Sequence, residues 1–166
     1  MSTERRLYVL RHAKSSWDDP RLRDDERPLS PRGVAATEAL SRHFLRLGLQ
    51  VELVLCSPAV RTRQTWAGVR DAVGGEPEVR IEPAVYEASA ATLLRLLHRV
   101  QDAVGSVLFV GHNPGSSALV GLLSEDVRGT ELPTGGFATL AFDTPWSGLV
   151  PGGARLVDLV RPRELD

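Results

Sequence analysis

The chain has 166 residues, of which 42% are hydrophobic and 25% are charged, and its formal net charge is −1. This length suits one domain, and the composition is that of a globular protein that can bury a core. We therefore expect residues 1–166 to form a single domain. The small net charge argues against nucleic acid or a membrane surface as a partner held mainly by charge, but it leaves room for a local basic pocket.

Cys56 is the only cysteine, so no intrachain disulfide can form and a thiolate metal cluster is excluded. It ends the apolar run Val51–Cys56, and we expect a buried core residue rather than a catalytic thiol. The N-terminal residues lack the long apolar run of a signal peptide, and no run approaches the ~20 residues that span a bilayer. These features predict a cytoplasmic protein without a membrane partner. They leave the oligomeric state open.

Short apolar runs alternate with helical patterns along the chain. Leu7–Leu10 is predicted to be the first strand, and the charged, proline-flanked stretch Asp18–Pro28 a loop. Ser30 then offers an N-cap, with Pro31 at the first helical position, and Gly48 marks the end of that helix.

The same alternation continues to the C-terminus. Further strands are expected at Val51–Cys56, Val79–Ile81, Val107–Val110, Phe137–Phe142 and Leu156–Val160, the last two at one edge of the sheet. Further helices are expected to start at Ser57-Pro58, Ser89 and Asn113-Pro114, and the first of these to end near Gly74-Gly75. This order predicts an α/β fold, a three-layer α/β/α sandwich with a largely parallel sheet.

Three segments that contain histidine or arginine follow predicted strands. Arg11-His12 follows the first strand, Ser57–Arg61 the second, and Gly111–Pro114 the buried fourth. Ligands of open α/β sheets bind beyond the carboxyl ends of the strands, so we expect two histidines and two arginines to meet at one rim.

These residue types suit a phosphoryl group. Guanidinium groups pair with its oxygens, the helix start at Pro58 favours an anion, and a neutral imidazole can attack phosphorus. The carboxylates and Gly-rich loop of a magnesium-dependent phosphate site are missing from these segments, so we expect no metal and no cofactor.

The ordered set of motifs resembles the histidine phosphatase superfamily. The motifs that carry the resemblance are Leu10–Lys14, Ser57–Arg61 with Gln64-Thr65, and Gly111–Pro114. Within that superfamily, the short length and the stretch Arg27–Ser30 with Gly33 resemble the small SixA-type phosphohistidine phosphatases. The resemblance covers essentially the whole chain and implies a fold like that of phosphoglycerate mutase.

The resemblance also implies roles by position. His12 corresponds to the nucleophile, which forms a phosphohistidine intermediate, and His112 to the histidine that stabilises the transferring group. Arg11 and Arg61 correspond to the arginines that hold the phosphoryl oxygens.

Four other residues fall near these positions. Ser15 and Asp18 stand where many superfamily members have polar pocket residues. Glu87 stands where larger members carry an acidic proton donor, and the alternative for it is a plain surface glutamate. Lys14 either extends the positive field at the pocket mouth or is a surface lysine. We assign no role to His43 and His98, which lie inside predicted helices.

We therefore expect a metal-independent phosphatase that works through His12, with a phosphorylated protein, as phosphohistidine, for its substrate. One alternative is a small-molecule phosphomonoesterase or a mutase-like phosphotransferase on the same scaffold. Another is an inactive phosphate-binding module, which an assay with an aryl phosphate distinguishes from the enzymes.

Overall fold

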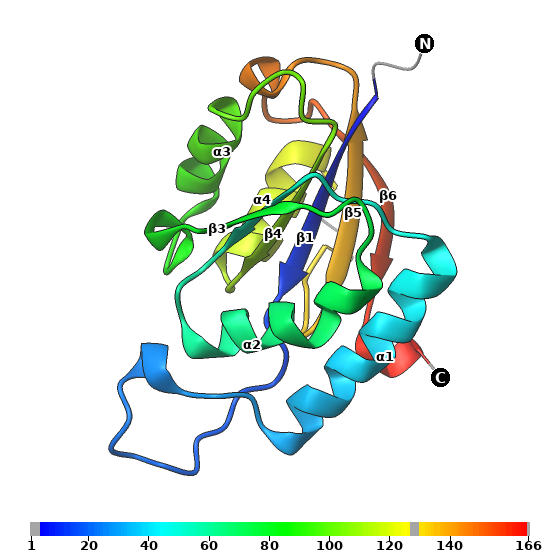
Figure 1. Ribbon diagram of the computed structural model, residues 1–166. Helices are drawn as coiled ribbons and strands as arrows, with labels where there is room; N and C mark the ends of the chain where they lie inside the picture. The colour runs from blue at the N-terminus through cyan, green and yellow to red at the C-terminus, as the bar shows by residue number, and fades with distance from the viewer. Residues whose placement is uncertain (1–3, 127–129, 166) are drawn as a thin grey trace.

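A computed structural model describes residues 4–126 and 130–165, whose strands form one six-stranded sheet in the order β3-β2-β4-β1-β5-β6 (Figure 1). The strands are β1 (Arg5–Arg11), β2 (Leu53–Cys56), β3 (Glu78–Ile81), β4 (Ser106–Gly111), β5 (Phe137–Phe142) and β6 (Arg155–Val160). The first four are parallel, whereas β5 pairs with β1, and β6 with β5, in the antiparallel sense. The largely parallel sheet and the position of the last two strands at one edge are confirmed, and the structure shows that this edge is antiparallel.

Helices cover both faces of this sheet. They are α1 (Pro31–Leu47), α2 (Val60–Val69), α3 (Ala90–His98) and α4 (Gly115–Ser124). Leu7 and Val9 of β1 pack in one core with α3 and α4, while Tyr8 and Leu10 pack in a second core with α1 and α2. Because successive side chains of a strand point to opposite faces, this alternation shows that the sheet is the middle layer. The three-layer α/β/α sandwich is confirmed.

The predicted ends of α1 are confirmed by their capping contacts. The Ser30 hydroxyl accepts a hydrogen bond from the Gly33 backbone N–H, Pro31 is the first helical residue, and Gly48 closes the helix in the left-handed conformation at φ 61°. Ser89 caps α3 in the same way, since its hydroxyl accepts a hydrogen bond from the Thr92 backbone N–H.

Other boundaries differ from the prediction. The helix expected at Ser57-Pro58 begins at Val60 and ends at Val69, and a short 3-10 turn, Arg70–Ala72, follows it. Its N-cap is Ala59 rather than Ser57, whose hydroxyl contacts a histidine. The stretch predicted as a loop contains one 3-10 turn, η1 (Asp24–Glu26).

The sheet order brings the predicted motifs together. Strand β4 lies between β1 and β2, with Gly111 opposite Arg11 and Val110 opposite Cys56. The residues that follow these three strands therefore share one rim of the sheet. In the part of the chain that the structure describes, no helix is long and apolar enough to cross a membrane.

Candidate active site

His12 and His112 lie side by side at this rim, with their ring centroids 5.3 Å apart. His12 follows β1, and its backbone N–H donates to the carbonyl of Gly111, which ends β4 and precedes His112. Both rings are buried, with exposed fractions of 7% and 9%. The adjacent parallel strands thus fix the two imidazoles relative to each other.

The hydrogen bonding of His12 sets its tautomer. Its Nδ1 lies 2.7 Å from the carbonyl oxygen of Ala13, and since a carbonyl only accepts, Nδ1 carries the proton and donates it. The lone pair is therefore on Nε2. Burial is the main cause that lowers the His12 pKa to about 4, and the positive charges of Arg61 and Arg11 act in the same direction. At neutral pH the ring is an uncharged imidazole that can act as a nucleophile.

The segment after His12 is fastened to both helices of its face. The Ala13 backbone N–H donates to the Thr65 hydroxyl of α2 at 3.0 Å. The Lys14 carbonyl accepts from the Ser30 backbone N–H, and a Cβ on Gly33 would collide with that carbonyl oxygen. Thr65 and Gly33 belong to the motifs that carry the family resemblance, and these contacts explain them as supports of the His12 segment.

His112 is held from two sides. Its Nε2 lies 2.7 Å from the Ser57 hydroxyl oxygen, and the Tyr86 ring packs edge-on against its ring with centroids 5.3 Å apart. Burial is the main cause that lowers the His112 pKa to about 3, followed by the charge of Arg61. His112 is therefore also uncharged at neutral pH.

Arg61 and Arg11 approach this pair from different elements. Arg61, in the first turn of α2, is buried and donates from Nη1 to the Asp24 carbonyl at 2.6 Å and from Nη2 to the Asp24 carboxylate at 2.9 Å. Arg11, the last residue of β1, is half-buried and donates from Nη1 to the Leu132 carbonyl at 3.0 Å. The charges of both arginines lower the pKa values of both histidines, so they act on one common site.

Three nitrogens of these side chains are buried without a hydrogen-bond partner among residues 4–126 and 130–165. They are Nε of Arg11, Nε of Arg61 and Nδ1 of His112. Each buried polar group left unpaired costs about 1–3 kcal/mol, so proteins rarely gather several in one place. Two of them are permanent N–H donors, and the third becomes one if the Ser57 hydroxyl donates to the other ring nitrogen of His112. This set fits an anion with several acceptor oxygens.

A second group of side chains supports the site, and most of its members have no role that the sequence predicts. Asp24 bonds Arg61, Arg27 and the Tyr86 hydroxyl, the last at 2.6 Å. The hydrogen bond from Tyr86 is the main reason why the Asp24 pKa falls to about 2, so this carboxylate is ionised at neutral pH. Arg27 also donates to the Ser15 hydroxyl at 2.8 Å. Ser15 thus contacts a residue of this supporting group rather than an imidazole ring.

Asp18 and Glu87 are the other predicted residues. Asp18 is exposed, and its backbone N–H donates to the Ser16 hydroxyl. Glu87 is exposed with a positive φ of 55°, and within the described ranges of the chain no hydrogen bond or ion pair joins it to either histidine. His98 bonds the Leu149 carbonyl, a structural contact.

Two further expectations concern Cys56 and metals. Cys56 is buried, as expected, and burial raises the pKa of its thiol to about 12, so it is not poised as a nucleophile. Among the described residues, no three or more His, Cys, Asp or Glu side chains are grouped to hold a metal ion.

Known proteins resemble this chain over most of its length. The model of the histidine phosphatase superfamily, branch 1, matches residues 7–112. An uncharacterised protein of Mycobacterium tuberculosis is 37% identical over 165 residues, which are 93% of this chain and 100% of that protein. Phosphohistidine phosphatase SixA of Escherichia coli is 25% identical over 148 residues, 86% of this chain and 88% of SixA. A structure from Nakamurella multipartitia, assigned to phosphohistidine phosphatase SixA, has a TM-score of 0.83 at 30% identity and 96% coverage of both chains.

Proposed function

The chain belongs to the histidine phosphatase superfamily and is a phosphatase, and from that premise we propose that it hydrolyses protein phosphohistidine through an intermediate on His12. The observation that carries the proposal is the set of unpaired buried nitrogens on Arg11, Arg61 and His112 beside a neutral imidazole. A phosphoryl group offers three oxygens to such donors and a phosphorus atom to the imidazole.

In the first step, His12 Nε2 attacks phosphorus. The new P–N bond forms as the bond between phosphorus and the substrate imidazole breaks, and the leaving imidazole takes a proton from water. The Ala13 carbonyl keeps the His12 proton on Nδ1, so phosphorylation at Nε2 leaves the His12 ring positively charged. A cationic ring is a better leaving group than a neutral one, and this prepares the second step.

In the second step, water attacks phosphorus and the P–Nε2 bond breaks. The electron pair returns to His12 Nε2, water loses its proton to solvent, and inorganic phosphate leaves. Through both steps Arg11, Arg61 and His112 hold the equatorial oxygens, where negative charge gathers. We propose further that no divalent metal takes part. The guanidinium groups of Arg11 and Arg61 supply the positive charge, and they would repel a metal cation.

The substrate class rests on two arguments. Relatives named phosphohistidine phosphatase share this fold and most of the chain length. The leaving imidazole of phosphohistidine also needs less protonation than an alkoxide, which suits a site where, among the described residues, no acid contacts the two histidines. General-acid catalysis raises rates by ~10²–10⁴-fold. A site with a weak general acid therefore loses more rate with alkyl phosphates than with phosphohistidine.

The test is to trap the intermediate and to compare substrates. Rapid quenching with labelled substrate should give an acid-labile, base-stable phosphate on the protein, absent from His12→Asn and present in His43→Gln as the control. kcat/KM should be higher for a phosphohistidine peptide than for a phosphoserine peptide or a sugar phosphate. A strong preference for the sugar phosphate would favour a small-molecule phosphatase, and normal turnover by His12→Asn would disprove the mechanism.

A further inference from the structure

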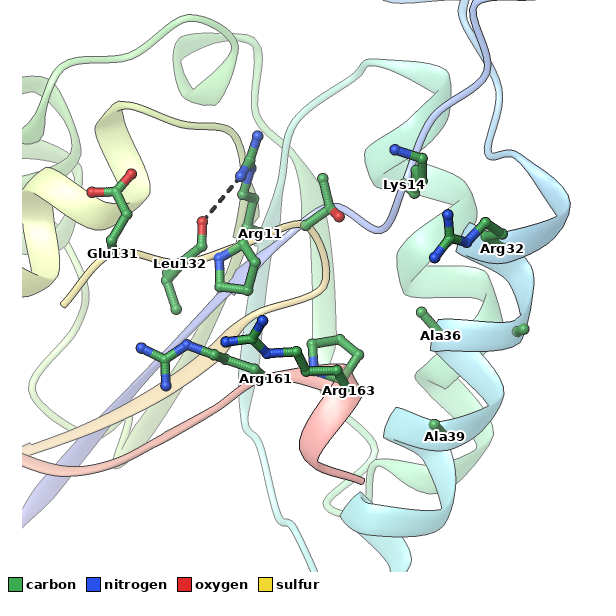
Figure 2. A pocket seen from close by; sticks show the side chains of 13 residues that line it. Arg11, Lys14, Arg32, Ala36, Ala39, Glu131, Leu132, Arg161 and Arg163 are labelled. Carbon is green, nitrogen blue, oxygen red and sulfur yellow. Dashed lines mark hydrogen bonds between the residues drawn. The ribbon is translucent and has the colours of Figure 1, made fainter. Parts of the chain in front are cut away.

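A large pocket lies next to the candidate active site and shares Arg11 with it (Figure 2). Its volume is about 770 Å³, within the range of pockets that bind ligands. Its walls come from α1, from residues 131–134 and from the C-terminal turn η5 (Pro162–Glu164). Apart from Arg11, the residues that line the pocket have no part in the proposed chemistry.

The pocket gathers positive charge. Its charged lining residues are Arg11, Lys14, Arg32, Glu131, Arg161 and Arg163. Five cations and one carboxylate give the lining a formal charge of +4, on a chain whose formal net charge is −1. We call this the basic pocket. A concave site lined by one sign of charge attracts ligands of the other sign.

Little of this charge is neutralised by the protein. Arg161 lies 3.4 Å from the Glu164 carboxylate, and Glu131 accepts a long hydrogen bond of 3.4 Å from Asn113. Within the described parts of the chain, no acid lies at ion-pair distance from Arg32 or Arg163, both of which are exposed. As far as the described residues go, Arg32 and Arg163 are therefore available to pair with a ligand.

The remaining lining is apolar except for Thr134. Ala35, Ala36 and Ala39 form the α1 wall, and Leu132 and Pro162 lie on other walls. Figure 2 shows Arg32 above Ala36 and Ala39 on α1, with Arg161 and Arg163 on the C-terminal segment across from them. Cations on separate walls suit several carboxylates on short aliphatic stems better than one compact anion.

Arg11 sets the position of this pocket relative to the reaction. Its side chain lines the pocket, and its charge lowers the pKa values of His12 and His112. Arg11 therefore belongs both to the candidate active site and to the basic pocket. We propose that this pocket binds acidic side chains that flank the phosphorylated residue of a protein substrate, an inference that rests on the proposed function.

The first experiment measures a specificity ratio. Two phosphohistidine peptides differ only in flanking glutamates or glutamines, and the ratio of their kcat/KM values is measured at low salt. We expect the wild type to favour the acidic peptide about tenfold, as electrostatic complementarity does for other partners. Arg32→Glu and Arg163→Glu should each reduce the ratio several-fold, and the double variant should bring it to about 1. Arg46→Glu, the same change on α1 outside the pocket, should keep the wild-type ratio.

The second experiment needs no catalysis, so it separates failure of the pocket from failure of the proposed function. Fluorescent hexaglutamate should bind the wild type and Arg46→Glu, but not the Arg32→Glu/Arg163→Glu double variant, all checked for folding by circular dichroism. Binding that the double variant retains would overturn the proposal. So would tripolyphosphate binding that depends on the pocket without hexaglutamate binding, because the pocket would then serve a compact phosphate anion. Pocket-dependent hexaglutamate binding supports the pocket even if the wild type cleaves no phosphohistidine peptide, a result that would reject only the proposed function.

Discussion

Asp24 holds Arg61 by two hydrogen bonds, one to its carbonyl at 2.6 Å and one to its carboxylate at 2.9 Å. Both terminal nitrogens of the guanidinium are thus engaged, and the buried Nε is the one left without a partner among the described residues. Because the Asp24 pKa is lowered to about 2, the carboxylate is charged at neutral pH. We regard Asp24 as a positioning residue that aims Arg61 at the phosphoryl group.

Asp24→Asn should therefore reduce kcat/KM by about ten- to a hundredfold, the effect expected when a charged hydrogen bond that orients a buried arginine is weakened. Inhibition by tungstate, a phosphate-like oxyanion, should weaken in parallel, whereas a purely structural loss would leave the affinity of the folded fraction unchanged. Asp25→Asn removes the same charge from the same turn, where Asp25 pairs with exposed Arg23, and serves as the control. Unchanged tungstate inhibition in Asp24→Asn would contradict this role.

The Ser57 hydroxyl plays a comparable part for His112. Ser57→Ala removes the 2.7 Å contact and leaves the ring free to rotate and to change tautomer, so we expect kcat to fall about tenfold. Quenched-flow measurements should show slower phosphoenzyme formation together with a shifted His112 NMR resonance. Ser124→Ala, which removes a hydroxyl that donates to the Val120 carbonyl of α4 instead of contacting a histidine, is the matched control. A normal His112 resonance with a slow enzyme would argue against this explanation.

Much of the fold and the centre of the site could be predicted from sequence. Apolar runs mark the strands, and because parallel strands end at one rim, Arg11-His12 and His112 could be predicted to share that rim. That β1 and β4 are neighbours, which brings the two histidines side by side, is seen only in the folded sheet. The supports could not be predicted. Asp24 sits in a stretch with four other carboxylates, and only the folded loop decides which of them meets Arg61. Ser57 fits the pattern of a helix cap, since proline follows it, and its hydroxyl accepts a 3.3 Å hydrogen bond from the Ala59 backbone N–H, but its shorter contact with His112 could not be predicted.

The depressed pKa values of the two buried histidines predict a particular dependence of stability on pH. Between the ordinary value of 6.5 and the folded value of about 4, the unfolded chain binds a proton at His12 that the folded chain does not. The free energy of unfolding therefore decreases as the pH falls through this window, by up to about 2 kcal/mol for His12 at pH 5. Urea unfolding at pH 7.5 and pH 5 should show a smaller acid loss for His12→Gln than for the wild type. Equal losses would mean that His12 is not neutral in the folded protein.

Removal of divalent metals should leave the enzyme active. The positive charge that faces the phosphoryl oxygens is proposed to come from Arg11 and Arg61, which chelators do not affect. After exhaustive dialysis against EDTA, kcat/KM at neutral pH should stay within about twofold of its value before dialysis. The guanidinium groups keep their charge at that pH whether or not a metal is present. A large loss that zinc or magnesium restores would require a different source of electrophilic assistance.

Glu87 is the predicted residue whose role the geometry leaves most open, and the choice of substrate can resolve it. It is exposed and follows Tyr86 along the chain, and the ring of Tyr86 packs on His112. If Glu87 is the proton donor, it acts on a departing alkoxide, which needs such help, whereas the imidazole leaving from phosphohistidine needs far less. Glu87→Gln should therefore reduce kcat/KM for an alkyl phosphate about ten- to a hundredfold and that for a phosphohistidine peptide less than about threefold.

The control is Glu76→Gln, because Glu76 is also exposed and also has a positive φ, 46° against 55° for Glu87. Equal effects of Glu87→Gln on both substrates would exclude a role in leaving-group protonation, and no effect on either would make Glu87 a surface residue.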